Sequence, residues 1–161
     1  MAEHSAHKNG WQIGEVVFGI PFLIGIGLNI ALPAALYPAG YQPFGIAAGA
    51  VLVISGLSLI SAARRELARF QQPTDPGQPT TGLVTTGVYG YSRNPLYLAA
   101  VLLFAGLAIA LNNLWVLGAT AVGIIACHFV LIAPEERYLE EKFAGEFVRY
   151  RQHVNRWLGK H

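Results

Sequence analysis

The chain has 161 residues, of which 53% are hydrophobic and only 12% are charged, and its formal net charge is +2. Water-soluble domains carry about 25% charged residues, so this composition is typical of a membrane protein, and the length is that of one domain. A single cysteine, Cys127, excludes an intramolecular disulfide and a zinc cluster, and the small positive charge gives no reason to expect a nucleic-acid partner.

Residues 1–13 are polar and predict a solvated tail. Its two histidines, His4 and His7, lie too far from other ligand types to indicate a metal site, so we expect no metal. The first uncharged stretch, about 16–36, is long enough to cross a bilayer. A cleaved signal peptide is the alternative, but the stretch is long for a signal and its end lacks a clean small-x-small cleavage site. We therefore expect a retained span.

Three further uncharged stretches lie at about 44–63, 96–111 and 114–133. At about 1.5 Å per residue, the last two helices would rise roughly 25 to 30 Å, close to the thickness of a bilayer core. With the first stretch they predict an all-α integral membrane domain over 1–161 with four transmembrane helices. The last two stretches should form a helical hairpin, because only the turn signal Asn112-Asn113 separates them.

Small residues inside these stretches predict close helix packing. Gly45-x-x-x-Gly49 and Gly56 lie in the second stretch and Ala119-x-x-x-Gly123 in the fourth, at spacings that let helix backbones approach each other. Between the second and third stretches, residues 71–82 are rich in proline and predict an exposed loop. Residues 83–88, which follow, are a short β-prone segment.

The basic residues predict the orientation of the chain. All eleven lysines and arginines fall on one side of the predicted topology: before the first span, between the second and third, and after the fourth. The connections 37–43 and 112–113 carry none. The positive-inside rule then places both termini and the middle loop in the cytoplasm, where the basic residues meet membrane lipids. The oligomeric state is left open.

After Pro134 the pattern becomes amphipathic and predicts a cytosolic helix on the membrane surface. Apolar residues recur three or four positions apart with charges between them, and Gly145 can divide the stretch into two helices. Trp157 and the basic residues suit the interface plane. The apolar residues are Leu139, Phe143, Phe147, Tyr150, Val154 and Trp157.

The hairpin predicts that the polar residues at its two ends meet at one membrane surface. Arg93 precedes the third stretch, and Glu135 and Glu136 follow the fourth. We expect Arg93 to bind a carboxylate as a fork, with a membrane anchor as the alternative. Glu135 should lie opposite Arg93 and contact a ligand. For Glu136 two interpretations stay open, a helix-start acid favoured by the macrodipole and a functional acid.

Other polar residues give weaker signals. Tyr89, Tyr91 and Tyr97 fit an interfacial belt as well as ligand contacts. His128 lies about two helical turns before Glu135, and an intramembrane histidine indicates either a functional group or a hydrogen-bonded packing residue. Gly25-Ile-Gly27 begins like a dinucleotide fingerprint, but no strand precedes it, so we reject that interpretation.

Four motifs follow one another along the second half of the chain. The first is Leu83-Val84-Thr85-Thr86-Gly87-Val88-Tyr89, and the second is Arg93-Asn94-Pro95-x-Tyr97. Beyond the hairpin come Glu135-Glu136 and then Phe143-Ala-Gly-Glu146-Phe147 with Tyr150. In this order they resemble the isoprenylcysteine carboxyl methyltransferase family and the related phospholipid methyltransferases, over roughly residues 80 to 157, about half of the chain.

The resemblance implies an integral membrane enzyme that uses S-adenosylmethionine. In that family the cofactor lies on the cytosolic side, between segments that match about 80–97 and 134–157. Arg93 and Glu136 are the catalytic candidates and His128 a substrate contact. Carried over by position, the residues that look like cofactor contacts are Leu83, Val84, Tyr89, Pro95, Tyr97 and Glu135, to which we add Gly87 and Asn94.

Two positions depart from the family pattern. The family usually has histidine where this chain has Asn94, and an amide keeps a hydrogen bond but carries no charge. Leu131 stands where the prenylcysteine enzymes have a substrate-binding arginine. The second difference weakens the case for a prenylcysteine carboxylate as the substrate.

These observations predict a methyltransferase that acts on a lipid or lipidated small molecule. Carboxyl O-methylation is the first choice, because a carboxylate nucleophile needs no general base. N-methylation of a phospholipid amine is the alternative, and it would need Glu136 or His128 as the base. A third hypothesis is a non-catalytic membrane binding or transport subunit of the same fold.

Overall fold

The computed structural model describes residues 14–73 and 80–160, so the predictions for 1–13, with His4 and His7, lie outside the described residues. Its α-helices are α1 (Gly14–Ala31), α2 (Gln42–Arg69), α3 (Pro95–Ala110), α4 (Leu114–Cys127) and α5 (Ala133–His153). Short helical turns lie at η1 (Ala39–Tyr41), η2 (Gly87–Gly90) and η3 (His128–Ile132). The β-prone segment 83–88 forms no strand, and it leads as irregular chain into η2.

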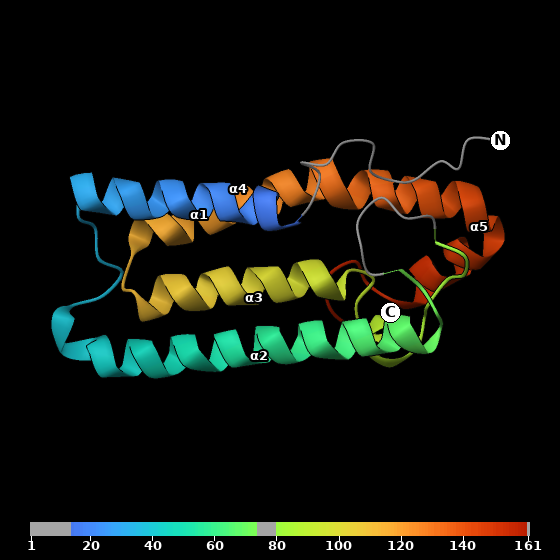
Figure 1. Ribbon diagram of the computed structural model, residues 1–161, viewed down its shortest axis with the longest axis horizontal. Coiled ribbons are helices and arrows are strands. Elements are labelled where there is room, and N and C mark those ends of the chain that lie inside the picture. Colours follow the sequence, from blue (N-terminus) through green and yellow to red (C-terminus); the bar gives the residue numbers. More distant parts are fainter. Residues whose placement is uncertain (1–13, 74–79, 161) are drawn as a thin grey trace.

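The helices form an elongated bundle in which α2 packs along α3 and α1 packs along α4 (Figure 1). We call the end with residues 32–42 and 111–113 the turn end, on the left of Figure 1. The opposite end, which holds η2, the start of α3 and all of α5, is the site end. The two ends are therefore separated by the length of the apolar helices.

Among the described residues, three helical stretches are long and apolar enough to cross a membrane: 14–31, 39–69 and 114–153. The apolar helix α3 has 16 residues and rises roughly 24 Å, somewhat less than the hydrocarbon core. The predicted number of four spans is therefore not confirmed by length. The first predicted span is also shorter than expected, because α1 ends at Ala31, two residues before Pro33.

Glycines set the distance between α2 and α3, as their spacing predicted. A Cβ atom on Gly49 would lie 2.5 Å from the carbonyl oxygen of Gly106, and one on Gly106 would lie 2.7 Å from that of Gly49. About two helical turns further along α2, a Cβ on Gly56 would lie 2.9 Å from the Ala99 carbonyl oxygen. These separations are far below ordinary van der Waals contact, so only glycine allows the two backbones to approach this closely.

The turn signal Asn112-Asn113 is confirmed, and its side chains close the turn end. Asn112 has a left-handed backbone with φ 51°, which asparagine tolerates better than most residues. Its Oδ1 accepts from the backbone N–H groups of Leu36 and Tyr37 at 2.8 and 3.0 Å. Asn113 caps α4 by accepting from the Val116 N–H at 3.0 Å.

The fourth predicted span does not end at residue 133, because α4, η3 and α5 continue as one helical stretch from 114 to 153. The link η3 is a π-helical turn in which the Ala133 N–H donates to the His128 carbonyl, five residues earlier. Pro134 follows directly, and its ring would clash with the carbonyl of residue 130 in a regular α-helix. The wider turn accommodates Pro134 without breaking the helix.

The amphipathic stretch after Pro134 is divided, and the break lies at Ala144, next to Gly145. Ala144 has φ 42° and ψ −118°, which is not helical. Arg151 Nη1 lies 3.0 Å from Glu140 Oε2, although a straight helix would place these residues roughly 16 Å apart. The second part of α5 therefore folds back on the first, as the right-hand end of Figure 1 shows.

Candidate active site

The two polar clusters predicted to meet do meet at the site end. The Tyr97 hydroxyl donates to Glu135 Oε2 at 3.0 Å, and Arg93 Nη1 lies 3.1 Å from Glu136 Oε1. The pairing differs from the expectation, because the salt bridge of Arg93 is with Glu136 and not with Glu135. Adjacent helical residues point about 100° apart, so the two glutamates face different partners.

The helix-start interpretation of Glu136 does not hold. Because the helix continues through η3, no free helix N-terminus lies at Pro134, and the macrodipole has no open end there. Glu136 is instead explained by its arginine partners. Its side chain is 12% exposed, and it lies between Arg93 on one side and Arg156 on the other.

Arg93 is a buried cation whose hydrogen bonds are incomplete. Its side chain is 8% exposed and its guanidinium lies 5.9 Å from the centre of the Phe147 ring. Within residues 14–73 and 80–160, neither Nε nor Nη1 has a hydrogen-bond acceptor, so the contact with Glu136 is an ion pair without hydrogen-bond geometry. Burial lowers the pKa of Arg93, and Glu136 partly offsets this. Such burial argues against the membrane-anchor interpretation.

Arg156 is a site residue that the sequence reasoning missed. Its Nη2 donates to Glu136 Oε2 at 2.6 Å and its Nε donates to Glu136 Oε1 at 3.1 Å, which is a bidentate pair. The hydrogen bond to Glu136 is the main reason why the pKa of Arg156 is raised. The sequence offered only a weak signal, since Arg156 is one of several basic residues after α5.

His128 adjoins this network at the start of η3. Its Nδ1 lies 3.4 Å from Arg156 Nη1, and because arginine can only donate, Nδ1 would be the acceptor of a hydrogen bond between them. The neighbouring Cys127 is buried in an apolar cluster with Phe18, Leu131 and Ile132, which supports its interpretation as packing. Leu131, which replaces an arginine of the prenylcysteine enzymes, is fully buried in the same cluster.

The C-terminal loop, residues 154–160, is bound to the segment around Arg93. The Arg93 N–H donates to the Asn155 carbonyl at 3.1 Å, and the Gly159 N–H donates to the Tyr91 carbonyl at 2.8 Å. Lys160 Nζ lies 4.7 Å from the centre of the Tyr91 ring. The loop therefore covers the chain that leads into α3.

Asn94, the residue before α3, holds this loop, and Pro95 begins the helix. Asn94 is buried, and its Nδ2 donates to the carbonyl of Arg156 at 3.2 Å, while Ser92 Oγ accepts from the Asn94 N–H at 3.1 Å. Pro95 is the first residue of α3, where a missing N–H costs nothing. The Asn94 amide therefore bonds to the protein itself, and Ser92 is a second residue that the sequence reasoning missed.

Gly87 is explained by a close approach to Glu66, another residue that was missed. Gly87 has φ 57°, and a Cβ there would lie 2.7 Å from the carboxyl carbon of Glu66. Glu66 is buried and accepts from Thr86 Oγ1 at 2.6 Å and from Arg69 Nη1 at 3.1 Å. The available signal was a single acid among the arginines that follow the second uncharged stretch.

The remaining predicted contacts lie in η2 and in the chain that precedes it. Val84 is buried, and Leu83 packs against the cluster of Phe147, Tyr150 and Val154. The Tyr89 carbonyl accepts from the Tyr150 hydroxyl at 2.6 Å. Burial raises the pKa of the Tyr89 hydroxyl, and the charge of Glu135 raises it further.

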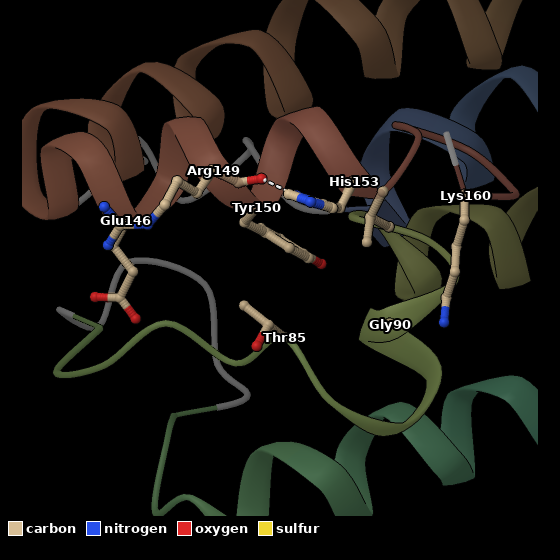
Figure 2. Close-up of a pocket in the computed structure, with 8 residues that line it drawn as sticks. Thr85, Gly90, Glu146, Arg149, Tyr150, His153 and Lys160 are labelled. Carbon is tan, nitrogen blue, oxygen red and sulfur yellow. Dashed lines mark hydrogen bonds between the residues drawn. The ribbon is translucent and has the colours of Figure 1, made fainter.

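A separate pocket of about 460 Å³ opens between residues 85–90 and the second part of α5 (Figure 2). Figure 2 shows the Tyr150 ring and Thr85 at its centre, with Glu146 and Arg149 to one side and Lys160 to the other. None of the predicted cofactor contacts lines this pocket. It is therefore not the site that the sequence predicted.

The site joins an ion-paired polar cluster to apolar helices of membrane-spanning length, which is the arrangement of a membrane protein with a polar site at one end of its bundle. The phospholipid methyltransferase family model matches residues 44–146, which is more than half of the chain. The chain belongs to the phospholipid methyltransferase family, so it is a membrane methyltransferase of the phospholipid and isoprenylcysteine type. The isoprenylcysteine carboxyl methyltransferase family itself is not confirmed.

One relative is an uncharacterized protein of Haemophilus influenzae (strain ATCC 51907 / DSM 11121 / KW20 / Rd). It is 36% identical to this chain over 63 residues, which are 39% of this chain and 100% of that protein. No solved structure matches the chain. The family assignment therefore rests on the match over 44–146.

Proposed function

We propose that the chain transfers a methyl group from S-adenosylmethionine to an anionic oxygen, most simply a carboxylate, of a lipid-like acceptor. The observation that supports this is the state of Arg93, whose buried guanidinium has two donor atoms for which the described part of the chain provides no hydrogen-bond acceptor. A carboxylate is a natural fork partner for these donors. Membership of a methyltransferase family supplies the reaction class.

The available bases favour a carboxylate over an amine as the acceptor. An amine must lose a proton before or during methylation, and Glu136 and His128 were the candidate bases. Both are engaged by Arg156: Glu136 through two hydrogen bonds and His128 through its acceptor nitrogen. A carboxylate is already deprotonated and needs no base, so the ion-paired site is sufficient for it.

The residues at the site suit S-adenosylmethionine. Glu135 and Tyr97, with the chain around Val84 and Tyr89, would hold it, because a carboxylate and hydroxyl groups match its ammonium and ribose hydroxyls. When bound, the cofactor supplies a methyl group that is already activated. The task of this chain is then to bind, orient and exclude water.

A lipid-like acceptor is supported by the surface that leads to the site. Val122, Ile125 and Phe129 are 59%, 60% and 69% exposed and recur along one face of α4 and η3, ending beside His128. An apolar tail lying along this stripe would place its polar head near Arg93. We also infer that α3 is a fourth span and that both termini are cytoplasmic, because every lysine and arginine lies on one side of that topology.

The test separates binding from chemistry. Purified protein in nanodiscs should bind S-adenosylmethionine by calorimetry, and Glu135→Gln should weaken binding about tenfold. Glu140→Gln is the matched control, since Glu140 forms an exposed pair with Arg151 and should change little. Failure of the unmodified protein to bind S-adenosylmethionine would contradict the proposal.

The base stability of the methylated product identifies the chemical class of the acceptor. Incubation with methyl-labelled cofactor and a lipid extract of the host should give a labelled product from which mild base releases methanol, as a methyl ester does. A base-stable label would instead indicate N-methylation and would reject the carboxylate acceptor.

A further inference from the structure

Three charged side chains at the site share one carboxylate unequally. Arg156 bonds to both oxygens of Glu136, at 2.6 and 3.1 Å, in a fork geometry. Arg93 meets only Oε1, at 3.1 Å and without hydrogen-bond geometry. The more exposed arginine therefore has the better partner, since the Arg156 side chain is 36% exposed and the Arg93 side chain 8%.

This distribution is unexpected from burial alone. A buried guanidinium gains more from a bidentate carboxylate than an exposed one does, because water does not supply its hydrogen bonds. Without Arg156, we expect Glu136 to turn both oxygens toward Arg93. Arg156 opposes this rotation because it donates to both oxygens.

We propose that Arg156 is a positioning residue: by holding both oxygens of Glu136, it keeps this carboxylate from forming hydrogen bonds with Nε and Nη1 of Arg93, so that the anionic group of the acceptor can accept them. The proposal rests on the proposed function, because it assigns the acceptor's anion to Arg93. Arg156 lies beyond residues 44–146, the part of the chain that the family model matches.

The C-terminal loop fixes the position of Arg156 relative to both Arg93 and Glu136. Its carbonyl accepts from Asn94 Nδ2 at 3.2 Å and from Ser92 Oγ at 3.5 Å. The preceding carbonyl, that of Asn155, accepts from the Arg93 N–H at 3.1 Å. The same loop thus fixes the backbone beside Arg93 and carries the side chain that holds Glu136.

His128 limits the position of Arg156 from a third direction. Its Nδ1 lies 3.4 Å from Arg156 Nη1, so each of the three guanidinium nitrogens of Arg156 lies close to Glu136 or His128. Arg93 and Arg156 together carry two positive charges against one on Glu136. The cluster therefore keeps an excess positive charge at its buried end, where an anion would be held.

The test uses palmitate, a long-chain carboxylate, as the probe of the anion site in nanodisc-embedded protein. Unmodified protein should bind it, and Arg156→Gln should bind it about tenfold more weakly, because Glu136 then closes on Arg93. Arg156→Lys keeps the charge but loses the fork, so it should fall between the two. Arg149→Gln, an exposed arginine of α5, is the control and should bind like the unmodified protein.

A double variant separates positioning from a merely structural role. In Arg156→Gln/Glu136→Gln the competing carboxylate is gone, so palmitate binding should return to within about threefold of the unmodified protein. If Arg156 only supported the fold, the second substitution would add damage and binding would stay weak. That result, or unchanged binding in Arg156→Gln, would overturn the proposal.

The cofactor provides an independent readout. S-adenosylmethionine binding should change less than about twofold in Arg156→Gln, since the carboxylate that Arg156 holds is Glu136, whereas the Tyr97 hydroxyl donates to Glu135. If the unmodified protein binds S-adenosylmethionine but does not bind palmitate, the role of Arg156 is rejected and the methyltransferase assignment stands. Absence of cofactor binding would instead reject the proposed function.

Discussion

The two ends of the bundle use their polar side chains differently. At the turn end, side chains bond to main-chain groups: Asn112 bonds to Leu36 and Tyr37, the Tyr37 hydroxyl donates to the Ile109 carbonyl, and Gln42 donates to the Ala110 carbonyl. At the site end, charged side chains bond mainly to one another. Arg93 there still has donors without acceptors.

This difference separates a structural end from a functional one. A main-chain acceptor is fixed by the fold, so the bonds at the turn end close loops and have no reason to change. A side-chain partner can be exchanged for a ligand of the same charge. A buried charge is costly unless it is paired and hydrogen-bonded, so an incompletely paired one indicates a functional site. Substitutions at the turn end should therefore change stability, and those at the site end should change activity.

Loss of Arg93 should have the largest effect on activity. Arg93→Ala removes the guanidinium whose Nε and Nη1 have no hydrogen-bond acceptor among the described residues, so kcat/KM for the acceptor should fall about a hundredfold, or roughly 2.7 kcal/mol of transition-state stabilisation. Binding of S-adenosylmethionine, measured by calorimetry, should persist. Arg137→Ala, an exposed arginine next to Glu136, is the control, and an equal loss in both variants would contradict a specific role of Arg93.

Contact between α2 and α3 should be the most sensitive structural feature. Gly49→Ala would force a Cβ to within 2.5 Å of the Gly106 carbonyl, so the helices must separate at a cost of about 2 kcal/mol. Thermal unfolding in detergent measures this loss. Gly27→Ala on α1 meets no atom within 4 Å and should be neutral or slightly stabilising. Similar melting temperatures for the two variants would contradict the packing role of Gly49.

At the turn end, Asn112 should affect stability and leave chemistry unchanged. Asn112→Gly keeps the left-handed backbone but removes the acceptor of two N–H groups, so we expect a loss of about 1 to 2 kcal/mol in unfolding free energy. Asn112→Ala adds the strain of φ 51° and should lose more. The turnover of the folded fraction should equal that of the unmodified protein, and a lower turnover would show that the two ends are coupled.

The sequence predicted the features that depend on short-range patterns. The uncharged stretches predicted the apolar helices, and Asn112-Asn113 predicted the turn. The hairpin predicted that Arg93 and Tyr97 lie close to the glutamates after Pro134. Each of these follows from periodicity, length or local turn chemistry. The glycine contacts of α2 were also predictable, because small residues at helical spacing indicate close packing.

The features that were missed depend on contacts between distant residues. Which glutamate pairs with Arg93 depends on helix rotation, and the π-turn η3 before Pro134 sets that rotation. Arg156 reaches Glu136 only because α5 folds back at Ala144 and the C-terminal loop returns to Ser92 and Asn94. Glu66 meets Gly87 across a proline-rich loop. No local sequence pattern predicts these contacts between residues that are far apart in the chain.

The pocket of Figure 2 should have the smallest effect, and it sharpens the contrast within the site end itself. Arg149 lines this pocket and is exposed, and the pocket contains neither Arg93 nor Glu136. Arg149→Gln should therefore change unfolding free energy by less than about 0.5 kcal/mol and acceptor kcat/KM by less than about twofold, because exposed charges contribute little. Steady-state kinetics beside Arg156→Gln measure the difference. A loss in Arg149→Gln as large as that in Arg156→Gln would place the acceptor in this pocket and away from Arg93.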